Sequence, residues 1–126
     1  MALPLIVGIG TDIVEIGRLR RGWERTGERF LRKVFTQEEL SYCRSFHDPW
    51  PHLAARFAAK ESVMKALGFH ADPLDIEILR RGTGAPRVAL RGSARSRAHK
   101  RGVGELKVSL SHTSRLAIAQ AVAVGR

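Results

Sequence analysis

The stretch from His52 to Leu67 constrains the fold of this 126-residue chain more than any other part of it. Apolar residues recur along it at helical spacing, flanked by alanines, and Gly68 follows where many helices end in a left-handed residue. The apolar stripe consists of Leu53, Phe57, Met64 and Leu67. A stripe of this width needs a broad apolar surface to cover it, and a sheet is the natural candidate.

Strand patterns around and after this helix supply such a sheet. Apolar and other residues alternate over 74–79 and 87–91, on either side of a Gly82-Thr83-Gly84 turn, which predicts a hairpin. A further alternation over 106–110 predicts a strand that reaches Ser111 and His112. From Arg115 to Val124 large apolar residues alternate with alanines, so one face of that strand is small and predicts close packing.

A first strand from Leu3 to Ile9 completes the set. The chain shows neither a repeat nor a linker, and its length suits one compact domain. The sequence therefore predicts a single domain, residues 1–126, of the α+β class: an antiparallel sheet packed against one long helix plus short helices.

Three further helices are predicted from their starts. Asp12, with Glu15 three residues later, has the spacing of a capping box and predicts a helix from Ile13 to Arg25. Thr36 and Glu39 form a clearer capping box for a helix that runs to about Phe46. Ser93 is expected to cap a short basic helix that runs to about Arg101.

The formal net charge of +10 predicts attraction to an acidic partner. Arginines gather early in the chain and again near its end, but aromatic residues do not alternate with them as base stacking requires. A nucleic-acid role is therefore disfavoured, although a basic binding module without catalysis stays open as the alternative. A single cysteine, Cys43, suits a reducing compartment, and no export signal or membrane span is recognisable, so a cytoplasmic location without membrane contact is expected.

Three short patches could carry chemistry, and each is ambiguous by itself. Glu61 and Lys65 are one helical turn apart, which fits a metal and phosphate site but also an ordinary surface ion pair. Asp12 could be a metal ligand or a plain helix cap, and His112 could bind phosphate or be a structural histidine. A dinucleotide site at the early glycines is rejected, because the third glycine of that fingerprint is missing.

Taken together, these patches resemble the holo-acyl-carrier-protein synthases, the small 4′-phosphopantetheinyl transferases. The front motif reads GIGTDIVEI, with Arg18 six residues after Asp12; the central one reads RFAAKES; the third, SLSH, ends at His112. The resemblance extends over nearly the whole chain. Two departures are Ser62, where alanine is commoner, and Ala85, where the family often has lysine.

The resemblance implies Mg²⁺-dependent transfer of the 4′-phosphopantetheine arm of coenzyme A to a serine of apo acyl carrier protein, with release of adenosine 3′,5′-bisphosphate. It implies Asp12 and Glu61 as metal ligands, which with Lys65 form the catalytic group. Coenzyme A would be bound by Lys65 and by Arg56, Ser111 and His112.

Partner contacts are implied as well. Arg18 and Arg29 would face the acidic carrier protein, and which type of carrier is served stays open. The family works as homotrimers, and the alanine-faced last strand suits close packing against a neighbouring subunit. Lys60, beside Glu61, receives no role.

Overall fold

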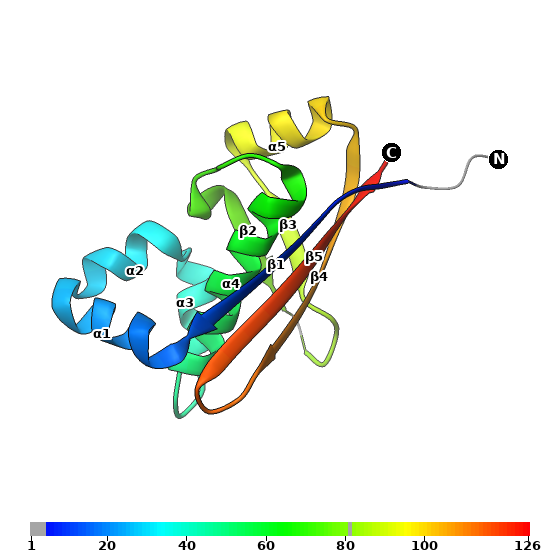
Figure 1. The fold of residues 1–126 in the computed structure, drawn as a ribbon. Coiled ribbons are helices and arrows are strands. Elements are labelled where there is room, and N and C mark those ends of the chain that lie inside the picture. Colours follow the sequence, from blue (N-terminus) through cyan, green and yellow to red (C-terminus); the bar gives the residue numbers. More distant parts are fainter. Residues whose placement is uncertain (1–4, 81) are drawn as a thin grey trace.

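The computed structural model describes residues 5–80 and 82–126, which form five α-helices, one 3₁₀ helix and five strands (Figure 1). In chain order these are β1 (Ile6–Glu15), α1 (Ile16–Thr26), α2 (Glu28–Val34), α3 (Gln37–Arg44), α4 (Trp50–Leu67), η1 (Pro73–Asp75), β2 (Ile76–Leu79), β3 (Arg87–Leu90), α5 (Gly92–Lys100), β4 (Val103–His112) and β5 (Leu116–Gly125). The α+β class with an antiparallel sheet on one long helix is confirmed.

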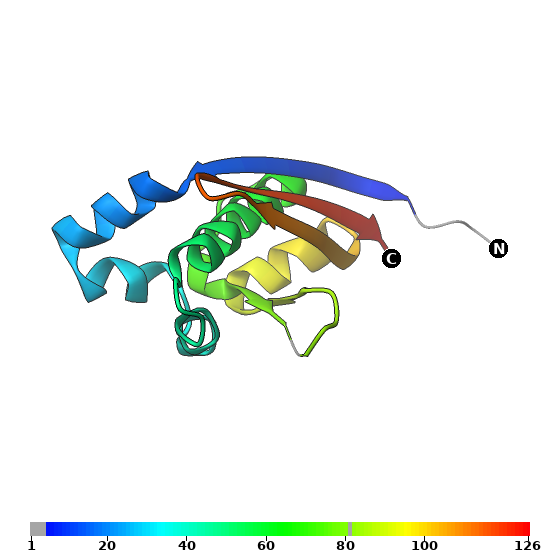
Figure 2. The same cartoon turned by 90° about the horizontal axis from the view of Figure 1, so that it is seen from below.

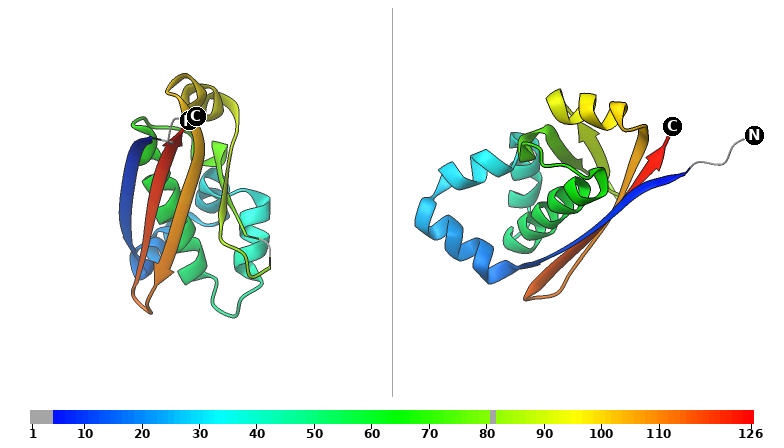
Figure 3. Two further views of the ribbon diagram at one scale, coloured as in Figure 1. Left: turned by 90° about the vertical axis from the view of Figure 1, so that its right-hand side faces the viewer. Right: turned by 45° about the horizontal axis from the view of Figure 1, so that its top comes forward.

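The main sheet is antiparallel, with strand order β1-β5-β4, and α4 crosses one of its faces (Figures 2 and 3). Its helix-facing side is built from small residues, because the alanines of β5 pair with glycines of β1: Gly8 with Ala123 and Gly10 with Ala121. These alanines are buried in the core that α4 also lines. The small face predicted for the last strand is therefore covered by a helix of the same chain, and the expectation that it packs against a neighbouring subunit is wrong.

A second, two-stranded sheet holds β2 and β3 in the hairpin predicted from the glycine-containing turn. The long helix also ends as predicted, since Gly68 has φ 80° and its N–H donates to the carbonyl of Met64. Thr36 and Glu39 form the predicted capping box at the start of α3. Patterns that depend on neighbouring residues were thus sufficient for these three features.

Two predicted caps are wrong. Asp12 lies inside β1, which pairs with β5 as far as Glu15, so α1 begins only at Ile16 and no side chain caps it. Ser93 lies inside α5, which follows Arg91 and again has no side-chain cap. In the first case a ladder of strand pairs outweighs a local capping pattern, because each added pair satisfies backbone groups that one cap cannot.

The first strand is longer than predicted, and the positions Leu3 and Pro4 at its expected start lie outside the described residues. Cys43 is a fully buried core residue. Among the helices at 5–80 and 82–126, none combines the length and the apolar character needed to cross a bilayer.

Candidate active site

Asp12 reaches the candidate site because β1 and α4 touch through their backbones. A Cβ on Gly10 would lie 1.9 Å from the carbonyl oxygen of Ser62, and one on Gly8 would lie 1.9 Å from that of Ala66. Only glycine permits this approach. Since side chains alternate along a strand, Asp12 shares the helix-facing side with Gly10.

Lys65 of α4 contacts this part of β1 directly. Its Nζ donates to the carbonyl oxygen of Thr11 at 2.8 Å and to Oδ1 of Asp12 at 3.2 Å. Half of the Lys65 side chain stays exposed, so the ammonium group can also meet an anion that arrives from solvent. The structure therefore joins two of the residues that the sequence proposed, Asp12 and Lys65, although they are far apart in the chain.

Glu61 and Asp12 line one cleft of about 630 Å³ between β1, α1 and α4. Arg18 of α1 lines the same cleft. The apolar part of the cleft wall includes Leu19, Phe30, Phe57 and Leu116. Phe57, expected on the core stripe, thus forms part of the cleft wall. Glu15 lines the cleft as a third carboxylate. With Arg18 on the wall and Lys65 bonded to Asp12, the cleft is a place where a metal ion and a phosphate group could both be held.

The donor set fits Mg²⁺ better than a metal enclosed by protein ligands. In the part of the chain that the structure describes, no three His, Cys, Asp or Glu side chains gather as a metal cage. Two carboxylates alone suit Mg²⁺, which commonly takes one or two protein carboxylates and completes its shell with water and substrate phosphates. Asp12 and Glu61 would be those ligands.

A second polar cluster lies elsewhere, where α3, α4 and the end of β4 meet. Arg56 is only 4% exposed and its guanidinium lies 4.2 Å from the centre of the Tyr42 ring. The ring of His52 stacks on Phe46 at 3.6 Å and lies 5.5 Å from that of His112. Burial, then the nearby His112 and Arg56, lower the pKa of His52.

This second cluster contains an unsatisfied donor. Nε of Arg56 is buried and has no hydrogen-bond partner among the described residues, while its Nη1 reaches only the carbonyl of His52 at 3.4 Å. His112 and Ser111 are exposed at the end of β4. Arg56, Ser111 and His112 are absent from the lining of the Asp12 cleft, so one chain does not bring all the proposed residues into a single pocket.

The two proposed partner residues also differ in position. Arg18 lines the cleft, whereas Arg29 is an exposed residue of α2 that does not. Both belong to the pair of helices that project from one end of the sheet (Figure 1).

A larger cavity lies elsewhere, a groove of about 1060 Å³ between β3, α5 and β4. Its charged lining is mainly basic, and Glu105 is its one carboxylate among the described residues. It cannot offer the paired carboxylates of the Asp12 cleft, so its size does not make it the centre of the chemistry.

The residues that sequence reasoning missed are the partners of Lys60. This lysine is 1% exposed and forms a buried ion pair with Glu39, and Glu77 is buried nearby. Burial lowers the pKa of Lys60, and the charge of Glu39 opposes that shift. The capping box identified Glu39, but nothing in its local pattern shows that its carboxylate also meets a lysine of another helix.

Comparison with known proteins gives a consistent family. Residues 8–121 match the 4′-phosphopantetheinyl transferase superfamily. The chain is 51% identical to a holo-[acyl-carrier-protein] synthase of Moorella thermoacetica over 116 residues, which covers 90% of each protein. It is 43% identical to the synthase of the same name from Caldanaerobacter subterraneus over 120 residues, covering 93% of this chain and 94% of the relative.

Solved structures agree. The holo-ACP synthase of Plasmodium yoelii superposes with a TM-score of 0.86 at 32% identity, covering 99% of both chains. The Helicobacter pylori synthase, solved in complex with coenzyme A, superposes with a TM-score of 0.80 at 30% identity, covering 93% of this chain and 99% of that one. The family match, the identities over most of the chain and the shared fold show that the chain belongs to the 4′-phosphopantetheinyl transferase superfamily and is a phosphopantetheinyl transferase of the holo-[acyl-carrier-protein] synthase type.

Proposed function

We propose that this protein transfers the 4′-phosphopantetheine group of coenzyme A to a serine hydroxyl of apo acyl carrier protein and releases adenosine 3′,5′-bisphosphate. The observation that carries the proposal is the cleft in which Asp12 and Glu61 lie together, with Arg18 on its wall and Lys65 bonded to Asp12. The coenzyme A complex of the related Helicobacter pylori protein supports the choice of donor.

The chemistry requires a base and charge neutralisation. The serine oxygen forms a bond to the phosphorus next to the pantetheine, and the bond from that phosphorus to the oxygen of the adenosine bisphosphate breaks. Glu61 is the candidate base that takes the serine proton, directly or through water. Lys65, whose side chain is half exposed, would neutralise the charge that develops on the leaving oxygen.

Magnesium is part of the proposal. Bound by Asp12 and Glu61, it would supply charge neutralisation for the pyrophosphate of coenzyme A. The nucleophile belongs to the carrier protein, so the chain itself needs no activated serine or cysteine.

Coenzyme A binding is proposed for Lys65, Arg56, Ser111 and His112. The unpartnered donor of Arg56 supports a phosphate contact near the histidines, since a buried guanidinium donor without an acceptor is costly. Because these residues and the Asp12 cleft do not share a pocket in one chain, a site formed between two copies would bring them together.

Two observations support a homotrimer: the divided set of site residues and the character of the outer face of the sheet. The side of the sheet away from α4 exposes large apolar residues: Val7, Ile9, Ile13, Leu116 and Ile118. Ile9 and Ile13 are 72% and 60% exposed, and Ile13 pairs directly with Ile118. The polar pair Thr11 and Gln120 interrupts this face. Exposed large apolar residues gathered on one side of a sheet are nevertheless typical of an interface between subunits.

The carrier protein is proposed to approach the basic helices α1 and α2. Arg18 and Arg29 would attract its acidic surface, which would raise the association rate at low salt. Binding of nucleic acid, the alternative suggested by the net charge, is not favoured: two arginines of the basic region, Arg97 and Arg101, lie over the ring of Phe69 within the protein.

Mass spectrometry tests the transfer directly. Purified protein, Mg²⁺ and coenzyme A are incubated with an apo acyl carrier protein, and the serine-bearing carrier is expected to gain about 340 Da, the mass of the transferred arm. The gain should disappear with a chelator or with a carrier whose serine is replaced by alanine. No mass gain with carriers of either fatty-acid or polyketide type would refute the proposed function.

A further inference from the structure

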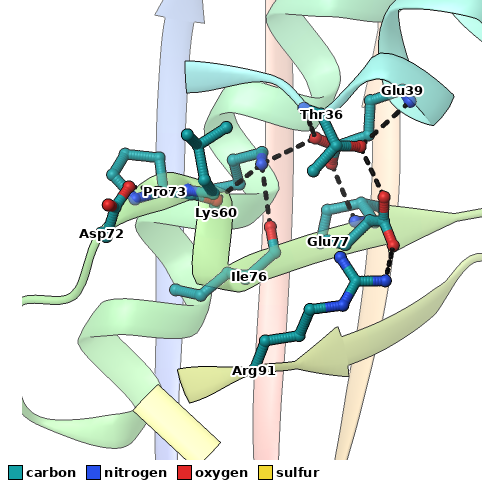
Figure 4. Close-up of polar contacts among 10 residues, drawn as sticks. Thr36, Glu39, Lys60, Asp72, Pro73, Ile76, Glu77 and Arg91 are labelled. Carbon is teal, nitrogen blue, oxygen red and sulfur yellow. Dashed lines mark hydrogen bonds and ion pairs between the residues drawn. The ribbon is translucent and has the colours of Figure 1, made fainter. Parts of the chain in front are cut away.

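A buried polar network joins α4 to three other elements, and none of its members lines the Asp12 cleft (Figure 4). At its centre, Nζ of Lys60 donates to Oε1 of Glu39 at 2.8 Å, to the carbonyl of Pro73 at 2.7 Å and to that of Ile76 at 2.8 Å. An ammonium group has three donors, and here each has its own acceptor. The side chain therefore has one defined position.

Its partners are equally constrained. Glu39 accepts at Oε1 from the backbone N–H of Thr36, and at Oε2 from that of Ile78 at 2.8 Å. Glu77 accepts from the hydroxyl of Thr36 and from the guanidinium of Arg91. Two positive and two negative groups balance, and they tie α3, η1, β2 and the residue after β3 into one unit.

Burial alone would raise the pKa of Glu77, but the hydrogen bonds from Thr36 and Arg91, together with the positive charges of Arg91 and Lys60, outweigh burial and lower it. The carboxylate therefore stays charged at neutral pH and keeps its place in the unit.

A second contact, made by Ser62, holds α4 to the main sheet. The single hydroxyl proton of Ser62 is shared between two carbonyl oxygens, that of Ala119 in β5 at 3.0 Å and that of Ala58 in its own helix at 2.8 Å. Lys60 and Ser62 thus bind different elements, the first η1 and β2, the second the main sheet. Glu61 lies between them in the sequence, and its side chain lines the cleft.

Stability alone does not account for this arrangement. A buried ion pair commonly adds little to stability relative to apolar residues of the same size, because removing both charges from water is costly. The three fixed acceptors of Lys60 do constrain geometry. They set the rotation of α4 about its axis and its position along that axis. A reacting carboxylate needs that placement, since a displacement of about 1 Å can cost roughly 100-fold in rate.

We infer that Lys60 is a positioning residue for the transfer reaction, holding α4 so that Glu61 lies correctly in the cleft. This inference rests on the proposed function. Lys60 acts through the helix and touches no substrate. Of the proposed coenzyme A ligands, Arg56 and Lys65 lie on α4 and Ser111 and His112 on β4, so a small shift of α4 leaves half of them in place. The same shift misaligns the reacting carboxylate, so turnover should fall more than the binding of coenzyme A.

The test uses the full-length protein and the carrier mass assay. In the variant Lys60→Met/Glu39→Gln both buried charges are removed and the side-chain volumes are nearly kept. We expect kcat to fall by about tenfold or more, while KM for coenzyme A and its calorimetric Kd change by less than about threefold.

Val63→Ala is the matched control. This neighbouring residue of α4 is fully buried and its side chain makes no polar contact. Its truncation therefore lowers stability without removing the hydrogen bonds of Lys60 or Ser62. At a temperature at which both proteins are folded, the control should keep a kcat within about twofold of the wild type. An equal loss of kcat in the control would show that lowered stability is sufficient and would overturn the inference.

Lys60→Arg covers the case in which the double variant does not fold. Arginine keeps the charge but cannot place three donors on the same three acceptors. A folded Lys60→Arg protein should also lose kcat, and wild-type turnover in it would overturn the inference even though the proposed function stands. If the wild-type protein itself transfers nothing, the proposed function fails instead, so the two failures are distinguishable.

Discussion

Replacing Gly10 by alanine should separate β1 from α4 and affect both stability and turnover. The added Cβ would lie 1.9 Å from the Ser62 carbonyl oxygen and 2.9 Å from the Ala66 nitrogen. Ordinary contact begins near 3.4 Å, so strand and helix must move apart by about 1.5 Å. Overfilled cores lose about 1–3 kcal/mol, and backbone atoms cannot rotate away, so we expect about 3 kcal/mol or more.

The loss is measurable by thermal unfolding followed by circular dichroism. For a chain of this size, 3 kcal/mol corresponds to a fall in Tm of roughly 10–15 °C. Because Asp12 lies on β1 and Glu61 on α4, the same movement separates the two carboxylates, and kcat should fall by about 100-fold below the transition.

Gly22→Ala is the control for the glycine-to-alanine change. Gly22 lies within α1, and a Cβ there would meet nothing within 4 Å. Alanine in that position should raise stability by about 0.5–1 kcal/mol, because glycine is a poor helix former. A Gly10→Ala protein with a Tm within about 2 °C of the wild type would refute the close approach of the two backbones.

Four further outcomes are expected. Asp12→Asn and Glu61→Gln should keep the fold but each lose most turnover in the carrier mass assay, and near-normal rates would remove them from the metal site. Glu77 has a lowered pKa in the folded protein, so its contribution to the free energy of unfolding should be present above about pH 4.5 and be lost as the pH falls below that value. In denaturant titrations across this range, the free energy of unfolding should depend less on pH in Glu77→Gln than in the wild type. Burial raises the pKa of Cys43 from 9.0 to about 11, which lowers the fraction of thiolate at pH 8. The native protein should therefore react with iodoacetamide about 100-fold more slowly than the unfolded protein, and equal rates would contradict the burial. Ile13→Asp, on the exposed sheet face, should shift the mass measured by light scattering from that of the proposed trimer to that of a single chain.

Sequence patterns predicted those parts of the fold that short-range chemistry decides. The long helix, its glycine end, the α3 capping box and the β2-β3 hairpin each depend on residues within a few positions of one another. Asp12 shows where this reasoning fails. Its spacing to Glu15 fits a cap, but pairing with a strand more than 100 residues later keeps it in β1.

The residues of the candidate site could be predicted from the sequence, but the contacts between them could not. Asp12 and Lys65 could be chosen from the sequence by motif resemblance, but their hydrogen bond depends on two glycines that permit β1 to touch α4. The early glycines carry no phosphate-binding signature, and only the structure shows that they serve helix contact. The partners of Lys60 could not be found either, because they lie on α3, η1 and β2.

One turn of α4 shows why its charged motif has no single role. Lys60 binds η1 and β2, Glu61 lines the cleft, Ser62 binds β5 and Val63 is buried in the core, so four consecutive residues meet four different surroundings. Helical periodicity predicts that neighbours at 100° intervals face different directions, but it does not say what they meet. The conspicuous cation beside Glu61 is therefore neither a surface charge nor a phosphate ligand in this arrangement. The positioning role of Lys60 makes the chemistry of Glu61 depend on contacts with α3, η1 and β2 that lie outside the cleft.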